Sequence, residues 1–262
     1  MTAVSLALLS FAAVLAASSA LLGWHVLRLR AEKHGRGLLG PWPVPVVVLE
    51  DFDARFAAGP LGPSRETEIA FIGAYRVPGG VSDLETWVLG SLAKDAGRIF
   101  EFGTATGKTT YLLARNAPAA ARVITLTLKP AQIGEYRGEA GDDPAAERAA
   151  AEESRFEAFY YSGTDVEPKI TQLFGDSKAF DAAPYAGTCD LVFVDGSHAY
   201  SYVKSDSEKA LEMVKPGGVV LWHDYRGPRS TKGVYRALNE LKDELGLRRL
   251  EGTSLVAYRK PG

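Results

Sequence analysis

Hydrophobic runs separated by longer amphipathic stretches dominate the chain after residue 80. Short apolar runs rich in β-branched and aromatic residues predict strands, and stretches whose apolar positions recur with a helical period predict helices. We expect strands over residues 98–102, 122–126, 170–174, 191–195, 219–222, 248–250 and 254–259, and helices over 82–93, 200–214 and 232–245, with another through Leu112. The alternation predicts an α/β fold: a doubly wound, mostly parallel, seven-stranded Rossmann-like sheet with a closing antiparallel hairpin.

The amino-terminal segment has a different pattern. Residues 1–27 contain no Asp, Glu, Lys or Arg, and an apolar helix of about 20 residues spans the hydrocarbon core of a membrane. We therefore expect a transmembrane anchor over residues 1–28. Basic residues follow it at Arg28, Arg30, Lys33 and Arg36. They predict a single-pass protein of the cell membrane with its folded domain in the cytoplasm. A cleaved signal peptide stays open, because residues 16–20 are all small.

Changes in composition mark two further segments. Residues 29–80 are expected to be a juxtamembrane linker and pre-domain segment, since residues 35–63 are rich in Gly and Pro. The folded domain is expected over residues 81–262. Within it, residues 131–161 form a polar insertion rich in Ala and Glu. We interpret this insertion either as a lid over the substrate side or as a solvated charged face.

Length and charge narrow the classes of function. The 262 residues are enough for one α/β domain plus an appendage. The formal net charge of −2 gives no basic field that would attract nucleic acid. Cys189 is the only cysteine, so an intrachain disulfide is impossible. We therefore expect a small-molecule site with no nucleic-acid partner, and the sequence leaves oligomerisation open.

A glycine-containing turn follows the first predicted strand of the domain. Gly103 and Gly107 allow the backbone to approach a ligand closely, and a helix begins directly after them. In a parallel sheet, such a turn lies at the ligand-binding edge. A phosphate-binding P-loop is disfavoured because that motif has four residues between its glycines, not three, and because Glu101 would repel phosphates. A plain βα turn without a ligand is the other alternative.

Polar clusters follow three later strands of the predicted sheet. They are Gly175-Asp176-Ser177, Asp195-Gly196-Ser197-His198 and His223-Asp224-Tyr225. Because the carboxyl ends of parallel strands share one edge, we expect these clusters to meet beside the Gly103 turn. Asp195, His223 and Asp224 offer two carboxylates and an imidazole, which suit Mg²⁺ or Mn²⁺. His198 is a candidate general base. The alternatives are that each Asp caps a helix and that His198 lies at the surface.

The order of these motifs resembles that of class I S-adenosylmethionine-dependent methyltransferases. The similar group is the metal-dependent O-methyltransferases related to macrocin O-methyltransferase and, more distantly, catechol O-methyltransferase. The motifs that carry the resemblance are residues 101–107 (EFGTATG), 175–177 (GDS), 193–198 (FVDGSH), 215–218 (KPGG) and 222–225 (WHDY). The first motif alone is moderately specific, whereas the five in this order are specific for the fold and the cofactor. The resemblance covers roughly residues 81–258.

The resemblance implies a role for each matched position. S-adenosylmethionine would be bound by Glu101, Gly103, Thr104, Gly107, Thr127, Asp176, Ser177 and Asp195. Of these, Asp176 and Ser177 would meet the adenine end. A Mg²⁺ ion would be held by Asp195, His223 and Asp224, and His198 would be the catalytic general base.

Two positions depart from the family pattern. The second strand of this superfamily usually ends in an acidic residue that holds the ribose hydroxyls, whereas Thr127 stands near that position here. A threonine hydroxyl can hydrogen-bond ribose, but without the assistance of a charge. His223 is the second departure, because the catechol enzymes have a carboxylate and an amide on this strand.

The expected function is a membrane-anchored, Mg²⁺-dependent O-methyltransferase that uses S-adenosylmethionine. Its acceptor would be a hydroxyl of a sugar, a polyketide or a lipid-linked glycan. One alternative is a degenerate methyltransferase-fold scaffold, which Thr127 favours. Another is a tailoring enzyme related to hydroxylases on the same fold. The joint presence of Glu101, Asp176, Asp195 and His198 argues against a decayed site.

Overall fold

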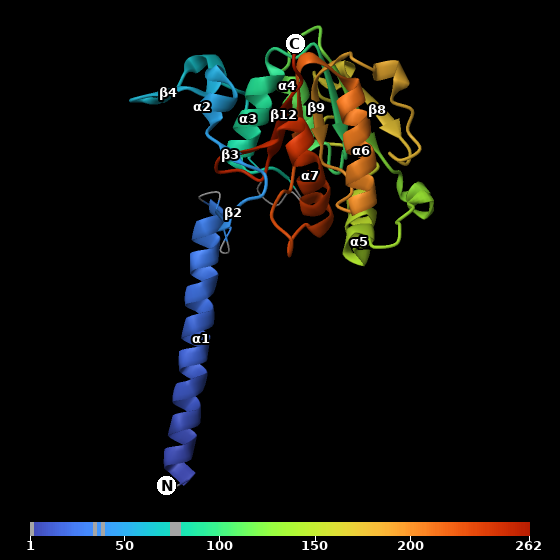
Figure 1. Ribbon diagram of the computed structural model, residues 1–262. Coiled ribbons are helices and arrows are strands. Elements are labelled where there is room, and N and C mark those ends of the chain that lie inside the picture. The colour runs from blue at the N-terminus through green and yellow to red at the C-terminus, as the bar shows by residue number, and fades with distance from the viewer. Residues whose placement is uncertain (1–2, 34–35, 38–39, 74–79) are drawn as a thin grey trace.

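The computed structural model describes residues 3–33, 36–37, 40–73 and 80–262, and it is built around a central eight-stranded sheet (Figure 1). The strands of this sheet are β3 (Val46–Val47), β6 (Arg98–Phe102), β7 (Arg122–Thr127), β8 (Ile170–Phe174), β9 (Cys189–Val194), β10 (Val214–Trp222), β11 (Arg248–Leu250) and β12 (Val256–Arg259). Their order across the sheet is β3-β11-β12-β10-β9-β6-β7-β8. All pairings are parallel except those of β12, which runs antiparallel to β10 and β11. The predicted fold class is confirmed, including the closing hairpin.

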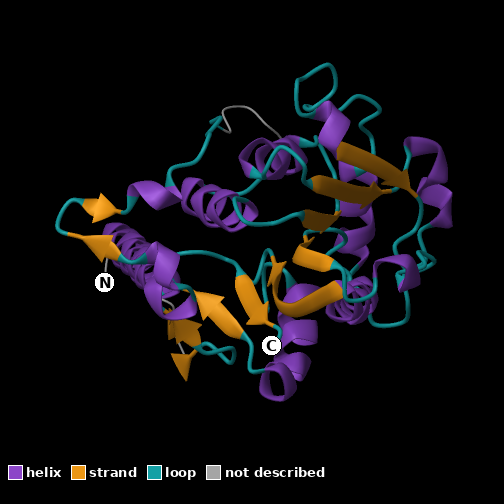
Figure 2. Ribbon diagram, turned by 90° about the horizontal axis from the view of Figure 1, so that it is seen from above, coloured by secondary structure: helices purple, strands orange, loops and turns teal. Residues whose placement is uncertain are grey.

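Helices lie on both sides of the sheet, as Figure 2 shows. The α-helices are α1 (Ala3–Lys33), α2 (Leu49–Phe52), α3 (Asp83–Ala93), α4 (Lys108–Asn116), α5 (Pro144–Glu153), α6 (Tyr200–Met213) and α7 (Lys232–Leu245). Short 3-10 helices cover Ala54–Phe56, Arg65–Thr67, Pro130–Glu135, Glu167–Lys169 and Ala183–Tyr185. Two small antiparallel pairs stand apart from the main sheet: β1 (Arg36–Gly37) with β2 (Gly40–Pro41), and β4 (Ala58–Gly59) with β5 (Gly62–Pro63).

The alternation of strand side chains divides the core into two layers. On β6, Ile99 packs with Leu89 of α3 and Leu113 of α4 on one face of the sheet. Its neighbour Phe100 packs on the other face with Met213 of α6 and Leu238 of α7. All of these side chains are fully buried. Because both faces are covered, the central strands are mostly apolar, with Glu101 of β6 and Thr125 of β7 as buried polar exceptions.

The eighth strand comes from the segment that we expected to be a linker. The backbone N–H of Arg249 donates to the Pro45 carbonyl at 2.8 Å, and β3 pairs parallel with β11. Val44 is fully buried, and the Trp42 ring lies 5.3 Å from the Tyr225 ring. Prolines are tolerated here because this is an edge strand, where one row of backbone groups needs no partner. The sheet therefore includes residues upstream of position 81.

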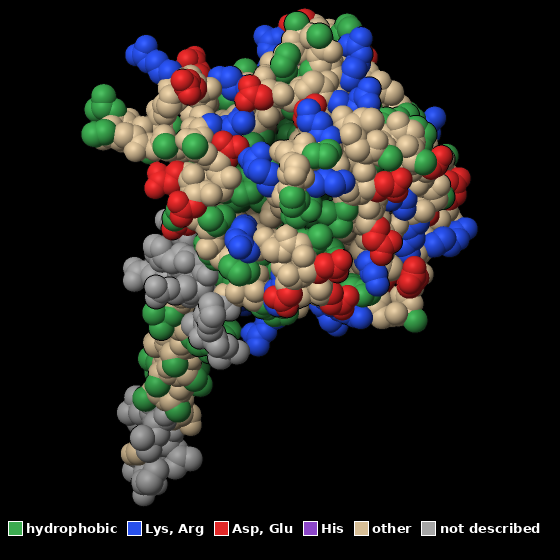
Figure 3. Space-filling model, turned by 45° about the horizontal axis from the view of Figure 1, so that its top comes forward, with side chains coloured by type: hydrophobic (Ala, Val, Ile, Leu, Met, Phe, Trp, Pro, Cys, Tyr) green, Lys and Arg blue, Asp and Glu red, His purple; other side chains and the backbone are tan. Residues whose placement is uncertain are grey.

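Helix α1 extends away from the sheet and presents an apolar surface (Figures 1 and 3). Its segment Ser10–Leu29 is long and apolar enough to cross a membrane, and none of it is buried against the rest of the chain. A signal sequence near the amino terminus has the same properties. The side chains of Arg30, Lys33 and Arg36 lie outside the described part of the chain.

Candidate active site

The turn after β6 adopts a conformation that its two glycines make possible. Gly103 has a φ of +95°, and a Cβ atom there would lie 2.1 Å from the Asp195 carbonyl oxygen. Gly107 has a φ of +74° and precedes α4, and a Cβ there would lie 2.8 Å from Cβ of Phe159. No larger residue fits either position without backbone movement. The turn thus brings β6 and the end of β9 into direct contact.

Beside this turn lies a first cavity of about 480 Å³, counted with its open mouth. Four of the predicted cofactor residues line it: Gly103, Thr127, Asp176 and Ser177. Apolar side chains of Phe102, Leu126 and Leu128 supply much of its wall. Since the four predicted residues come from three different strand ends, the sheet topology has brought them together as expected. The glycine turn and the mixed polar and apolar walls fit a nucleoside-containing ligand.

Asp206 of α6 also lines the first cavity, although no sequence pattern predicted this. The residue is 1% exposed, and its Oδ1 atom has no hydrogen-bond partner. Burial raises the pKa of the Asp206 carboxyl to about 7, against the effect of a hydrogen bond with Ser177. An aspartate within a helix is usually solvated, so only the tertiary fold shows that it lies under the cavity.

Glu101 and Thr104 lie deeper than the resemblance implied. Glu101 is fully buried and lines neither cavity; its Oε2 atom accepts from the hydroxyls of Thr110 and Thr125, the latter at 2.7 Å. Its Oε1 atom has no hydrogen-bond partner. Burial raises the pKa of this carboxyl to about 8. Thr104 is 2.7 Å from the Thr125 hydroxyl and reaches only the second cavity, described next.

A second cavity of about 1020 Å³, counted with its open mouth, lies on the other side of the turn. It is lined by charged side chains from several elements: Lys108, Glu152, Glu153, Arg155, Asp195, His223, Asp224 and Arg226. Gly103, Ala105 and Glu153 line both cavities, so the two spaces meet at these residues. A group bound in one cavity can therefore face a group bound in the other.

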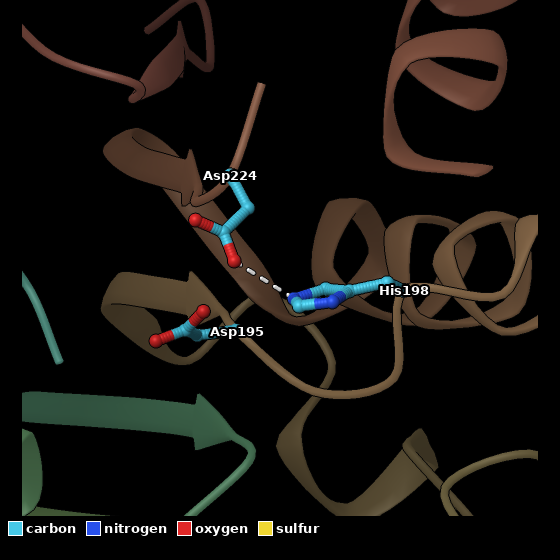
Figure 4. Close-up of side chains that lie close together, drawn as sticks. All are labelled: Asp195, His198 and Asp224. Atoms are coloured by element: carbon cyan, nitrogen blue, oxygen red, sulfur yellow. Dashed lines mark ion pairs between the residues drawn. The ribbon is translucent and has the colours of Figure 1, made fainter. Parts of the chain in front are cut away.

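Three of the predicted residues form a compact cluster, and two of them, Asp195 and Asp224, line the second cavity (Figure 4). One donor atom from each of Asp195, His198 and Asp224 lies within 4.8 Å of the others. Nε2 of His198 is 2.8 Å from Oδ2 of Asp224. Oxygen donors at this spacing suit a hard divalent cation such as Mg²⁺. Within the described residues, this is the group of acidic and histidine side chains that could hold such an ion.

His223 was predicted to belong to this cluster, and its Nδ1 atom lies 3.3 Å from Oδ1 of Asp224. The residue is 5% exposed; its Nδ1 atom is 2.8 Å from Oδ1 of Asp195 and its Nε2 atom is 3.4 Å from Oε2 of Glu85. Burial alone would lower the pKa of His223, yet the carboxylates of Asp195 and Glu85 raise it well above its usual value. Both ring nitrogens are therefore occupied by carboxylates.

His198 and Asp224 of the cluster also shift each other's pKa values. Burial opposes a charged His198, but the Asp224 carboxylate raises the pKa of this histidine. Conversely, the pKa of Asp224 is lowered by the two histidines despite its burial. Asp224 has a φ of +62°, and its Oδ1 atom lies 2.7 Å from a guanidinium nitrogen of Arg226.

The insertion contributes a carboxylate that the sequence did not single out. Glu153, the last residue of α5, lines both cavities. Burial raises the pKa of Glu153 to about 7, with further contributions from Asp195 and Asp224. The carboxyl end of α5 therefore reaches the site. No helical or strand pattern could have indicated this, because it depends on how the insertion folds back.

Comparison with known families bears on this site. A family model described as a methyltransferase domain matches residues 100–225, which include both glycines, the cluster and His223. No curated protein matches the chain at a significant level. The match over residues 100–225 agrees with the predicted methyltransferase class.

Several solved structures are similar in part. They include the O-methyltransferase TomG from Streptomyces achromogenes in complex with SAM (18% identity, 69% of this chain and 82% of that chain, TM-score 0.45). An O-methyltransferase from Bacillus cereus in complex with SAH has 16% identity over 71% of this chain and 86% of that chain, with a TM-score of 0.47. The SAH-bound methyltransferase PaMTH1 from Podospora anserina has 19% identity over 70% and 80%, with a TM-score of 0.46. Similarities of this size carry no conclusion about the acceptor or the mechanism.

Proposed function

We propose that this protein is an O-methyltransferase that binds S-adenosylmethionine in the first cavity and a hydroxyl-bearing acceptor in the second. The observation that carries the proposal is the junction of the two cavities at Gly103, Ala105 and Glu153, beside the Asp195 cluster. Methyl transfer requires the methyl donor and the acceptor oxygen to be aligned and close. A site with two connected cavities supplies this by positioning.

The residues of the first cavity support the cofactor end of the proposal. We assign Asp176 and Ser177 to the adenine end of the cofactor and Thr127 to its ribose hydroxyls. All three residues line the cavity. Thr127 offers a neutral hydroxyl, so its hydrogen bond to ribose is weaker than one to a carboxylate. In this proposal Glu101 supports the turn from below and does not line the cavity, because its carboxyl is fully buried.

We further propose that Asp195 and Asp224 hold a Mg²⁺ ion. When bound there, the ion would bind the acceptor hydroxyl oxygen and lower its pKa. His198 is within reach as a third donor, but Mg²⁺ prefers oxygen ligands. We therefore assign His198 the role of the general base; because its Nε2 atom contacts Asp224, the hydroxyl proton would go to Nδ1. The ion pair between His198 and Asp224 would orient the ring for this step.

The amino-terminal helix supports a location at a membrane. We propose that residues 1–28 anchor the protein with its catalytic domain in the cytoplasm, and that the acceptor is a sugar, polyketide or lipid-linked glycan hydroxyl. The exposed apolar surface of Ser10–Leu29 supports the anchor. The mass of the mature amino terminus, together with protease protection of the membrane-bound protein, tests it. An amino terminus cleaved near residue 20 would replace the anchor by a signal peptide.

A transfer assay on the full-length protein in detergent tests the proposed reaction. The protein is incubated with S-adenosylmethionine bearing a labelled methyl group, Mg²⁺ and a panel of hydroxylated acceptors. A product heavier by one methyl group supports the proposal, whereas a gain of one oxygen would indicate hydroxylation. Absence of binding to S-adenosylhomocysteine by a folded protein would favour a scaffold.

Two variants test whether the reaction takes place at the Asp195 cluster. We expect Asp195→Ala to lower the transfer rate by about 100-fold or more, because loss of a metal site removes several kcal/mol of transition-state stabilisation. Glu208→Ala, an exposed acidic residue of α6, is the matched control and is expected to retain full activity. Unchanged activity of Asp195→Ala would contradict the proposed metal site.

A further inference from the structure

Glu85 makes more contacts than a helix-capping residue needs. It lies in the first turn of α3 and forms a capping box with Ser82, in which its Oε2 atom accepts from the Ser82 backbone N–H at 2.8 Å. Its Oε1 atom accepts from both the backbone N–H and the hydroxyl of Ser254, at 2.7 and 2.8 Å. The side chain is 4% exposed. A carboxylate is buried to this degree only when many donors compensate its desolvation.

The fourth contact of Glu85 leads towards the candidate active site. Nε2 of His223 is 3.4 Å from Oε2 of Glu85, and Nδ1 of the same ring is 2.8 Å from Oδ1 of Asp195. Glu85, His223 and Asp195 come from α3, the end of β10 and the end of β9. The imidazole therefore connects a buried carboxylate to a carboxylate that faces the second cavity.

The His223 ring is surrounded by carboxylates. Its Nδ1 atom lies 2.8 Å from Oδ1 of Asp195 and 3.3 Å from Oδ1 of Asp224, and its Nε2 atom lies 3.4 Å from Oε2 of Glu85. Ligating carboxylates are commonly oriented by hydrogen bonds from neighbouring groups. His223 is in the right place for that role with respect to Asp195.

We propose that Glu85 and His223 are positioning residues that hold the Asp195 carboxylate in the orientation required at the second cavity. This inference rests on the proposed function, because it takes Asp195 to face the cation and the acceptor. It assigns His223 a role through Asp195, whereas the sequence predicted only a direct contact with the metal.

Calorimetric titration of the full-length protein with Mn²⁺ tests the inference. The variants are His223→Gln, Glu85→Gln, their combination, and Asp195→Ala. We expect each of the first two to weaken Mn²⁺ binding by roughly 10-fold, within the range found for groups that orient metal ligands. The combination should be no weaker than His223→Gln alone, since Glu85 acts through the imidazole. Only Asp195→Ala should abolish binding.

Ser254→Ala is the matched control, because it removes one hydrogen bond to Oε1 of Glu85 and leaves the contact with His223. It should bind Mn²⁺ like the unaltered protein. The inference is overturned if His223→Gln abolishes binding as completely as Asp195→Ala while Glu85→Gln has no effect, because His223 would then be a ligand. The melting temperature of each variant shows whether it is folded.

A second measurement separates this inference from the proposed metal site. Long-range ¹H–¹⁵N spectra of the histidine rings should show a slowly exchanging ring N–H signal for His223, and Glu85→Gln should alter the His223 ring signals. If the unaltered protein binds no Mn²⁺, the metal proposal fails while these signals still report on the Glu85–His223–Asp195 chain. Rapid exchange at both nitrogens, or spectra that Glu85→Gln leaves unchanged, would overturn the positioning role.

Discussion

Glu85 and Glu101 are both buried beside the candidate active site, yet the protein holds their carboxylates in opposite ways. Glu85 accepts hydrogen bonds from two backbone N–H groups, a hydroxyl and an imidazole, and these donors lower its pKa despite its burial. Glu101 accepts from two hydroxyls only, one of its oxygens has no partner, and burial raises its pKa to about 8. The same residue type is thus charged at one position and close to neutral at the other.

The difference shows that the donors around a buried acid, rather than burial itself, determine its charge. Around Glu85 the donors include His223, whose pKa is raised in turn, so the pair is stable as ions. The charge that acts on Glu101 is that of another carboxylate, Asp195, which opposes ionisation. The two acids should therefore respond oppositely to substitution and to pH.

The largest effect is expected for Glu85→Ala, which leaves the buried imidazole of His223 without one of its three acidic partners. Removing one member of a buried ion pair costs about 3–5 kcal/mol of the free energy of unfolding. Urea denaturation at pH 7, followed by tryptophan fluorescence, measures this loss. A loss below about 1 kcal/mol would show that the two ions are independent.

A smaller effect, with a distinct pH dependence, is expected for Glu101→Gln. Because the pKa of Glu101 is raised from 4.5 to about 8, its stabilising contribution is complete below pH 4.5 and is lost as the pH rises to about 8. Between pH 5 and pH 8 this amounts to about 3 kcal/mol. The free energy of unfolding, measured by denaturation at several pH values in this range, should vary less with pH for Glu101→Gln than for the unaltered protein.

For Glu85 we expect the opposite dependence of the free energy of unfolding on pH. Its pKa is lowered from 4.5, so its stabilising contribution is present above pH 4.5 and is lost as the pH falls further. Glu85→Gln should therefore flatten the acid side of the stability curve and leave the slope between pH 5 and pH 8 unchanged. If the free energy of unfolding changed with pH in the same way for Glu101→Gln and Glu85→Gln, the expected contrast between the two sites would be wrong.

Asp206 tests whether a second acid behaves like Glu101. Burial raises its pKa from 3.8 to about 7, which places the loss of its stabilising contribution between these pH values. Between pH 5 and pH 7, Asp206→Asn should remove about 2 kcal/mol of this pH dependence of the free energy of unfolding, because an amide does not titrate. Because Asp206 lies under the first cavity, titration with S-adenosylhomocysteine should show whether the same change alters cofactor affinity.

The smallest effect is expected for Ser254→Ala. It removes one of four hydrogen bonds to Glu85 and retains the backbone N–H bond at 2.7 Å. A hydroxyl bonded to a charged group contributes about 1.5–3 kcal/mol, and water can replace part of this at a half-buried position. We expect a loss of about 1 kcal/mol by urea denaturation. A loss as large as that of Glu85→Ala would mean that Ser254 and not His223 keeps the carboxylate stable.

Local patterns in the sequence were sufficient for the fold and for much of the site. The seven predicted strands and the closing hairpin all occur, because strands buried on both faces give continuous apolar runs. The turn at Gly103 and the strand ends at Asp176, Asp195 and Asp224 could be read directly. Strand β3 was missed because a two-residue edge strand within a Pro-rich segment has no periodic signal.

What the sequence determined by itself is the set of strand ends that meet at one edge of the sheet, since chain order and parallel pairing require it. The methyltransferase class follows from the same motifs. The tertiary structure alone decided where each polar side chain points: His198 into the cluster, His223 between Asp195 and Glu85, and Asp206 beneath the first cavity. Such directions depend on contacts between residues far apart in the chain, and these contacts leave no trace in any local pattern.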